Sequence, residues 1–198
     1  MPGQIKIDDG AGNYTILTNA GSLGSDKTIT IPNETGTVAL TSDITSGLAV
    51  ADQYDITSNI TSTQAVITNW ARPTGTLQGN LGSGITESSG IFSFPSTGFY
   101  YVNCFFTLGV ISGSPGYFDI HFYTTDDDFS TEDKVWSIAV STPSNQSFMA
   151  QKSAILDITD VSNQKVKLTI PTEVGSCEIN GSLTESRSAI QFFKLGDT

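Results

Sequence analysis

The run from Phe99 to Phe106, FYYVNCFF, restricts the folds open to this chain more than any other feature. One phase of the predicted strand reads Phe99, Tyr101, Asn103 and Phe105, and the other reads Tyr100, Val102, Cys104 and Phe106. Successive side chains in a strand point to opposite faces of a sheet, so both faces are largely apolar here. Residues 117–123 show a similar pattern. A two-sheet sandwich hides only one of these faces, and the other needs a further partner, which favours an oligomer.

The composition indicates an all-β protein. Only 15% of the residues are charged, against about 25% in ordinary soluble domains. Thr, Val, Ile, Phe and Tyr, which favour strands, are abundant, and 19 glycines punctuate the chain. The predicted strands span residues 14–17, 28–31, 37–40, 64–70, 90–94, 99–110, 117–124, 135–141, 147–158, 165–170 and 188–195. Turn signals separate them, so we expect a β-sandwich with a jelly-roll or immunoglobulin-like topology and no helix longer than a turn.

The chain divides into two parts at a hinge-like stretch over residues 45–51. Residues 1–46 contain a single aromatic side chain, Tyr14, and bury too little apolar surface to fold alone. This part is expected to associate with copies of itself or to dock on a partner; a flexible tail is the alternative. Residues 47–198 hold almost all the aromatic side chains and therefore the core.

The charge balance excludes several functions. A net charge of −11 with scattered cations does not suit nucleic acid or an anionic membrane surface, both of which need clustered Lys and Arg. No apolar run approaches the roughly 20 residues of a membrane span, and the N-terminus does not read as a signal peptide. With one histidine and two cysteines, no Cys/His zinc site is expected, and we predict no cofactor and no catalytic residue.

Four features invite a chemical interpretation, and a plainer one is favoured for each. The acidic run 126–128, with Glu132 and Asp133 nearby, offers carboxylates to Ca²⁺, but a solvated hairpin loop is preferred. Cys104 lies in a strand and Cys177 in a Gly-rich turn; a bridge is open to them, and two thiols are preferred. His121 is interpreted as structural or interfacial. The loop residues Glu87, Glu173, Glu178 and Glu185 could in principle supply the carboxylate pair of a glycosidase, but nothing in their spacing singles out two of them.

Residues Gly90 to Phe106 carry a family resemblance. Gly90, Phe92, Pro95, Gly98 and Tyr100 match the pattern Gly-x-Phe-x-x-Pro-x-x-Gly-x-Tyr of the globular head of complement subcomponent q, which is grouped with the tumour-necrosis-factor-like jelly rolls. Residues 154–158, 165–170 and 188–196 resemble later strands of that family in the expected order. The resemblance implies a ten-strand-type jelly roll over residues 47–198 that assembles as a homotrimer.

The same resemblance implies which residues face the three-fold axis. They are Phe99, Tyr101, Asn103, Phe105, Gln191 and Phe193, with Tyr123 and His121 as weaker additions. The alternative is that these side chains belong to the core of a monomer or lie under a loop.

A second resemblance lies in the first part of the chain. TITIPNETGTVALTSDI, residues 28–44, resembles a segment of bacteriophage tail-fibre and other minor virion proteins that typically reads Thr-Ile-Thr-Leu-Pro-x-x-Thr-Gly-Thr-Ile-Ala-Leu. The residues that this resemblance assigns to virion attachment are Thr28, Ile29, Ile31, Pro32, Gly36, Val38 and Leu40. It implies a capsid or tail protein as partner and a location on the outer surface of the virion.

Together these features predict a non-enzymatic bacteriophage structural protein. Residues 1–46 form an extended β adaptor that attaches to the particle, and residues 47–198 form a trimeric head whose loops contact a host-surface glycan or protein. One alternative is a capsid decoration protein without a receptor. Another is a soluble complement-like lectin or adhesin, and an enzyme is the least favoured.

Overall fold

The computed structural model describes residues 5–8, 14–17, 47–110, 116–142, 146–175 and 177–198. The chain separates into two units, Met1–Ile44 and Thr45–Thr198. In the first unit, β1 (Ile5–Asp8) pairs antiparallel with β2 (Tyr14–Leu17). The sequence predicted β2 with the same bounds and did not predict β1. The strands expected at residues 28–31 and 37–40, and the seven attachment residues, lie outside the described residues. We call residues 47–198 the head.

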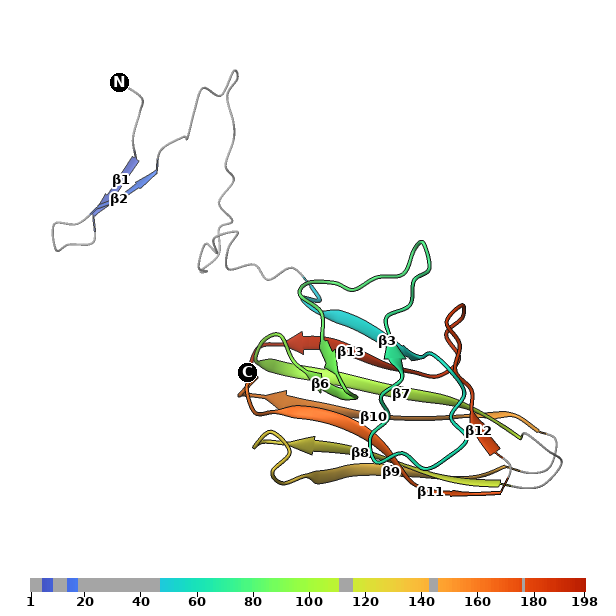
Figure 1. The fold of residues 1–198 in the computed structure, drawn as a ribbon. Coiled ribbons are helices and arrows are strands. Elements are labelled where there is room, and N and C mark those ends of the chain that lie inside the picture. Colours follow the sequence, from blue (N-terminus) through green and yellow to red (C-terminus); the bar gives the residue numbers. More distant parts are fainter. Residues whose placement is uncertain (1–4, 9–13, 18–46, 111–115, 143–145, 176) are drawn as a thin grey trace. The chain divides into compact units, whose positions relative to one another are not determined.

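The head is a sandwich of two antiparallel sheets (Figure 1). The six-stranded sheet has the order β10-β7-β13-β3-β4, with β12 also paired to β7. Its strands are β3 (Ala51–Ile56), β4 (Trp70–Ala71), β7 (Gly98–Val110), β10 (Phe148–Ile158), β12 (Cys177–Ile179) and β13 (Ala189–Gly196). The five-stranded sheet, β5-β6-β11-β8-β9, consists of β5 (Thr86–Ser88), β6 (Ile91–Ser93), β8 (Gly116–Thr125), β9 (Asp133–Thr142) and β11 (Lys165–Val174). The described residues contain no helix, so the predicted all-β jelly-roll sandwich is confirmed.

The core lies between the sheets and is built from one phase of each long strand. Along β7 the buried side chains are those of Tyr100, Val102, Cys104, Phe106 and Leu108. Strands β8 and β11 add Phe118, Ile120, Phe122, Val166, Leu168 and Ile170 from the other sheet. Phe92 of β6 lies at the centre of an aromatic cluster, with ring centroids 5.4–5.6 Å from those of Tyr54, Trp70 and Phe192. The even phase of the FYYVNCFF strand is therefore the core phase.

The structure corrects the prediction of a strand over residues 64–70. Gln64 makes only an isolated bridge to Ile170, and β4 begins at Trp70. The chain bends between them: the Trp70 indole Nε1 donates a hydrogen bond to the Ile67 carbonyl at 2.8 Å, while the Ile67 side chain is fully buried. The segment covers the core as a loop, and its backbone bonds to β11 only at two points: Gln64 exchanges hydrogen bonds with Ile170, and the Ile67 N–H donates to the Leu168 carbonyl.

The stretch over residues 45–51 leads into β3, which begins at Ala51. The place of Cys177 differs from the one expected. Cys177 lies in β12, paired with Val110 of β7, and not in a turn. Both cysteines are buried thiols, as preferred from the sequence. Burial raises the pKa of the Cys104 thiol and, with the nearby Glu173 carboxylate, that of Cys177.

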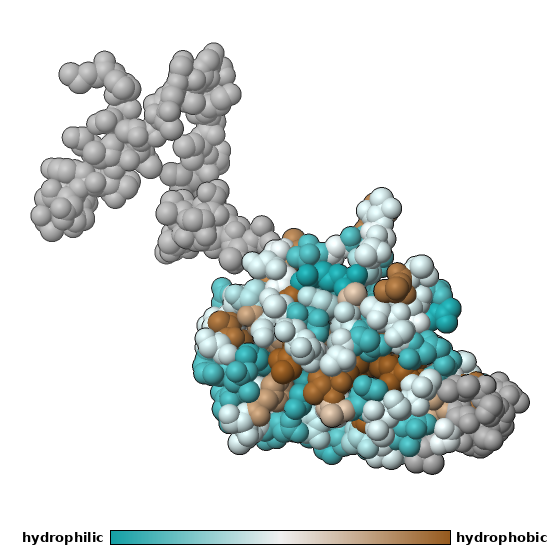
Figure 2. Space-filling view, viewed as in Figure 1, coloured by the Kyte–Doolittle hydropathy of each residue, from teal (hydrophilic) through white to brown (hydrophobic). Residues whose placement is uncertain are grey.

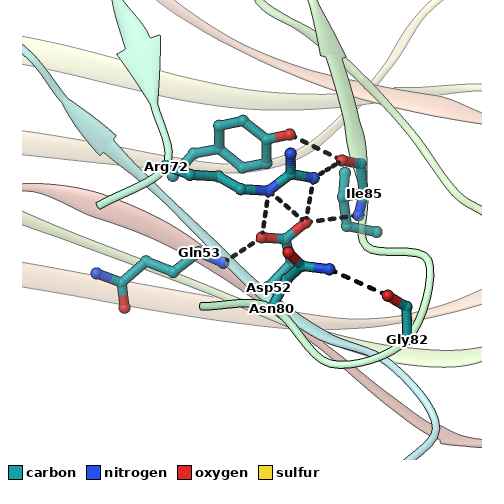
Figure 3. A network of polar contacts seen from close by, with 7 residues as sticks. Asp52, Gln53, Arg72, Asn80, Gly82 and Ile85 are labelled. Carbon is teal, nitrogen blue, oxygen red and sulfur yellow. Dashed lines mark hydrogen bonds and ion pairs between the residues drawn. The ribbon is translucent and has the colours of Figure 1, made fainter. Parts of the chain in front are cut away.

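An ion pair with a buried carboxylate fastens the segment between β4 and β5 to the six-stranded sheet (Figure 3). The Asp52 side chain, 1% exposed, accepts hydrogen bonds from Arg72 Nε at 2.9 Å and Arg72 Nη2 at 2.8 Å. It also accepts from the backbone N–H groups of Ile85 and Gln53. The Arg72 guanidinium lies 4.8 Å from the Tyr54 ring centroid. Hydrogen bonding to Asp52 is the main cause that raises the pKa of Arg72.

Candidate functional site

All six residues predicted for the trimer axis lie on the outer face of the six-stranded sheet. Phe99, Tyr101, Asn103 and Phe105 occupy the phase of β7 opposite to the core phase. Gln191 and Phe193 lie on the adjacent strand β13, opposite Asn103 and Tyr101 respectively. The central part of this outer face comprises Gln151, Ser153, Ile155 and Asp157 of β10, Phe99, Tyr101, Asn103 and Phe105 of β7, Ala189, Gln191 and Phe193 of β13, and Ala51, Gln53 and Asp55 of β3. Met149 of β10 and Glu178 of β12, opposite Thr107 and Gly109 of β7, lie on the same face toward one end.

One end of this face is apolar. The rings of Tyr101 and Phe193 lie 6.4 Å apart at 33°, and Ile155 is opposite Tyr101 on β10. Ile155 is 65% exposed and Phe99 is 40% exposed. Figure 2 shows that hydrophobic surface gathers in a band across the head, as seen from its side of view. Large apolar side chains grouped on a protein surface mark a contact site more often than a solvated one.

A chain of side-chain amides crosses the same face from strand to strand. Gln151 Nε2 of β10 donates to Asn103 Oδ1 of β7 at 2.8 Å, and Asn103 Nδ2 donates to Gln191 Oε1 of β13 at 3.0 Å. Gln191 Nε2 donates to Gln53 Oε1 of β3 at 2.7 Å. Gln53 Nε2 then donates to the carboxylate of Asp55 at 2.8 Å. We call these four amides and Asp55 the amide relay.

Asp55 sets the direction of the whole relay. An ionised carboxylate only accepts, so Gln53 must present its NH₂ group to Asp55 and its carbonyl to Gln191. The same constraint passes to Asn103 and to Gln151, and every amide points the same way. Ser186 completes the end, because its Oγ donates to Asp55 and accepts from Gln53, both at 2.8 Å. The relay is therefore a polarised row of hydrogen bonds, in which each bond strengthens the next.

The outer face of the six-stranded sheet carries almost no charge. Its fourteen central residues include no Lys, Arg or Glu, and their two acids lie on opposite sides. Glu178 of β12 also lies on this face, opposite Gly109, and accepts hydrogen bonds from the side-chain amides of Asn59 and Asn180. Asp55 is only 5% exposed and is held by the relay, while Asp157 lies at the edge opposite Phe99. In a chain with a net charge of −11, this surface is the one on which copies can meet with little repulsion.

Tyr123 and His121, the weaker additions to the axis, belong to a different surface. They lie on β8 of the five-stranded sheet, on its outer face together with Asp119. His121 Nε2 is 2.9 Å from Asp119 Oδ2, and His121 Nδ1 is 3.1 Å from the Tyr123 hydroxyl. The structure therefore does not bring them onto the same face as the six residues of β7 and β13, because the sequence pattern does not tell which sheet a strand joins.

The acidic run forms a hairpin loop in which the carboxylates of Asp127, Asp128 and Glu132 bond to other groups of the chain. Asp127 accepts hydrogen bonds from Thr131 N at 2.9 Å and from the hydroxyls of Thr125 and Thr131 at 2.8 Å. The backbone N–H of Thr131 is the main cause that lowers the pKa of Asp127. Asp128 pairs with Lys165, and Glu132 pairs with Lys167. Within the described residues, no three His, Cys, Asp or Glu side chains cluster as metal ligands would.

Three members of the relay, Asp55 and the two amides Gln53 and Gln151, were not predicted from the sequence. Glutamine occurs anywhere on a surface, and nothing in the local pattern marks these two. Their role depends on the register of the strands. Gln53 lies opposite Gln191, and Gln151 lies opposite Phe105, two residues from Asn103 on β7.

The described residues include no helix long and apolar enough to cross a membrane.

Comparison with known proteins assigns the fold of the head. No family model matches the sequence, and no curated protein matches it either. Among solved structures, Eiger, a tumour necrosis factor of S. frugiperda, superposes with a TM-score of 0.55 and 14% identity, covering 76% of this chain and 94% of that one. Murine APRIL superposes with a TM-score of 0.51 and 13% identity, covering 74% and 98%. The head therefore has the tumour-necrosis-factor-like jelly-roll fold that its sequence signature implied.

Proposed function

We propose that the chain forms a homotrimer through the outer face of the six-stranded sheet. The observation that carries this proposal is the combination of exposed aromatic and aliphatic side chains with the near absence of charge on that face. The tumour-necrosis-factor-like fold, with its resemblance to trimeric heads, supports the same assembly.

A closed ring of copies needs two complementary surfaces on each copy, because its contacts are head to tail. The open side of the sandwich, between the edge strands β10 and β9, supplies the second one. There Ile138, Ala154 and Leu156 pack against the core but stay partly exposed. Lys152 Nζ spans the opening and donates to the Ser137 carbonyl at 3.0 Å. The apolar side chains on this side are suited to contact Tyr101, Ile155 and Phe193 of a neighbouring copy.

We further propose that the protein is a non-enzymatic component of a bacteriophage virion. The similarity of residues 28–44 to a recurring tail-fibre segment supports this role, and a trimeric jelly-roll head suits the end of an appendage. Residues 1–46 would attach to a capsid or tail protein, and the head would present three equivalent sets of loops to a host-surface glycan or protein. Three weak contacts on one axis gain strength by raising the effective concentration of each.

A soluble trimeric ligand or adhesin is the second candidate, and the likeness of the head to Eiger and APRIL favours it. The two functions differ in where the protein is found. Imaging intact particles that carry a label at Thr198 is expected to show the label on the outer surface. Particles made with a chain that lacks residues 47–198 are expected to assemble and to lose adsorption to the host. The absence of the chain from purified particles would refute the virion role.

The trimer is tested separately, on the purified full chain. Light scattering is expected to give three times the chain mass of 21.0 kDa. A mass of 21.0 kDa at micromolar concentration would refute the assembly, whatever the location of the protein.

A further inference from the structure

The amide relay leaves hydrogen-bonding groups unused on a surface that is proposed to be buried. Each amide nitrogen in the relay has two N–H groups, and Gln151, Asn103 and Gln191 each direct one of them along the relay. At the β10 end, among the described residues, the Gln151 Oε1 atom accepts no hydrogen bond. The relay thus offers spare donors along its length and a spare acceptor at one end.

Burial of these groups without partners would oppose assembly, since a buried polar atom without a hydrogen bond costs more than the bond itself gains. The apolar contacts at Tyr101, Ile155 and Phe193 do not solve this problem, because hydrophobic attraction has no direction and tolerates many relative rotations of two copies. Only an arrangement that brings spare acceptors to spare donors satisfies the relay. A polar group at an otherwise apolar interface is known to select one register in this way.

We propose that the amide relay determines the register of the assembly, with a second copy of this chain as its partner. The spare donors and the Gln151 carbonyl bond to polar groups of the neighbouring copies, so only one mutual rotation of the copies leaves none of them unsatisfied. The apolar end of the face contributes the affinity between copies, and the relay selects a single mutual arrangement of them. The proposal rests on the proposed trimer and adds to it the reason for a single oligomeric state.

The decisive variant is the double substitution Asn103→Leu with Gln191→Leu, analysed as the full chain by native mass spectrometry and light scattering. Leucine fills a similar volume without any hydrogen-bonding group, so the double substitution removes both central amides and keeps the face apolar. The copies are therefore expected to stay associated but to distribute over two or more oligomeric states. Circular dichroism of the variant should show the β spectrum of the wild type. A single trimeric species with the thermal midpoint of the wild type would overturn the register role.

A second variant, Gln191→Glu, removes the donor to Gln53 and places a carboxylate in the middle of the face. The trimer is expected to dissociate about tenfold more readily, or more, because the charge is buried without a partner. The control is Gln164→Glu: the Gln164 Oε1 atom only accepts, from the N–H groups of Thr159 and Asp160, so a carboxylate keeps those bonds. This control adds the same charge and should leave the trimer intact; equal behaviour of both variants would contradict the proposal.

The possible results distinguish a failure of the proposed trimer from a failure of the register role alone. If the wild-type chain is monomeric, both the trimer and the register role fail. If the wild type is trimeric, Tyr101→Asp dissociates it and both relay variants behave as the wild type, then the trimer stands and the register role fails.

Discussion

The two outer faces of the head differ in how they deal with charge. On the five-stranded sheet, Lys165 and Lys167 of β11 pair with Asp128 and Glu132, and Asp119 pairs with His121 on β8. The Lys167 ammonium also lies 4.3 Å from the ring centroid of Phe129. On the six-stranded sheet, the outer face carries amides and aromatic rings and no ion pair among its described residues.

This difference shows that apolarity in both phases of a strand does not identify an interface by itself. Both β7 and β8 have that pattern. The second phase of β8 is covered from within the chain, because Tyr123 lies against His121 and beneath Lys167. The second phase of β7 has no such cover, and Phe99 stays 40% exposed. An uncharged face without a cover of its own is the better sign of a partner.

The largest expected effect is that of a charge on the outer face of the six-stranded sheet, measured against the same charge on the outer face of the five-stranded sheet. Tyr101→Asp puts a carboxylate between Ile155 and Phe193, where it would be buried without a partner, and should convert the trimer to monomers. Interface residues of this kind each contribute about 2–4 kcal/mol to association. The matched control is Tyr123→Asp on the five-stranded sheet, which should leave the mass in light scattering unchanged. Dissociation by the control alone would reverse the assignment of the two faces.

The next effect concerns the ion pair on the inward side of the six-stranded sheet. Arg72→Ala leaves the buried Asp52 carboxylate without its partly exposed cation, and the free energy of unfolding should fall by about 1.5–3 kcal/mol. Arg187→Ala removes the cation of the exposed pair with Glu185 and should cost about 1 kcal/mol or less. Denaturant unfolding of both variants measures the contrast, and equal losses would show that Asp52 is stabilised by its backbone N–H donors alone.

A smaller loss is expected on the five-stranded sheet. Lys167→Ala removes the pair with Glu132 and the contact with the Phe129 ring, together worth about 1 kcal/mol. The loss should shrink at high salt, which screens the ion pair, and the oligomeric state should stay the same. A change of mass on this substitution would mean that the five-stranded face also contacts a neighbour.

The smallest effect is one of pH, at the acidic hairpin loop. Hydrogen bonds lower the pKa of Asp127 in the folded chain, so the ionised form stabilises the fold above the ordinary aspartate pKa of about 3.9. This contribution is lost as the pH falls through the lowered pKa. Asp127→Asn should therefore melt slightly below the wild type at pH 7, with a difference that shrinks below about pH 4 and disappears once the pH is below the lowered pKa. A difference that grows on acidification would contradict the shift.

The long strands and the core phase were predictable from the sequence because each is a local pattern. The structure also explains why the signature Gly-x-Phe-x-x-Pro-x-x-Gly-x-Tyr has glycine at two fixed positions. Gly90 has φ +82°, and a Cβ atom there would lie 2.2 Å from the Ile67 carbonyl oxygen; Gly98 has φ +142° and is crowded by the Gly196 carbonyl oxygen. Only glycine meets both demands.

The short strands and the relay could not be predicted, because neither depends on a local pattern. β5 and β12 have three residues each, too few to show alternation. β12 forms along the end of the long strand β7, and β5 pairs with β6, which also has three residues. Gln53 and Gln191 are 138 positions apart in the chain and meet only through the pairing of β3 with β13. The six axis residues were found together on one face because they lie on just two strands with clear alternation.

The burial of the two thiols has a consequence for the media in which the protein can work. The thiolate is the form that reacts with oxidants and disulfides, and the pKa of both Cys104 and Cys177 is raised, so both sulfur atoms stay protonated and shielded. The head therefore needs no disulfide to hold its shape and offers no reactive thiol to form a wrong one. A chain of this kind is able to fold in a reducing medium and to keep the same covalent structure in an oxidising one.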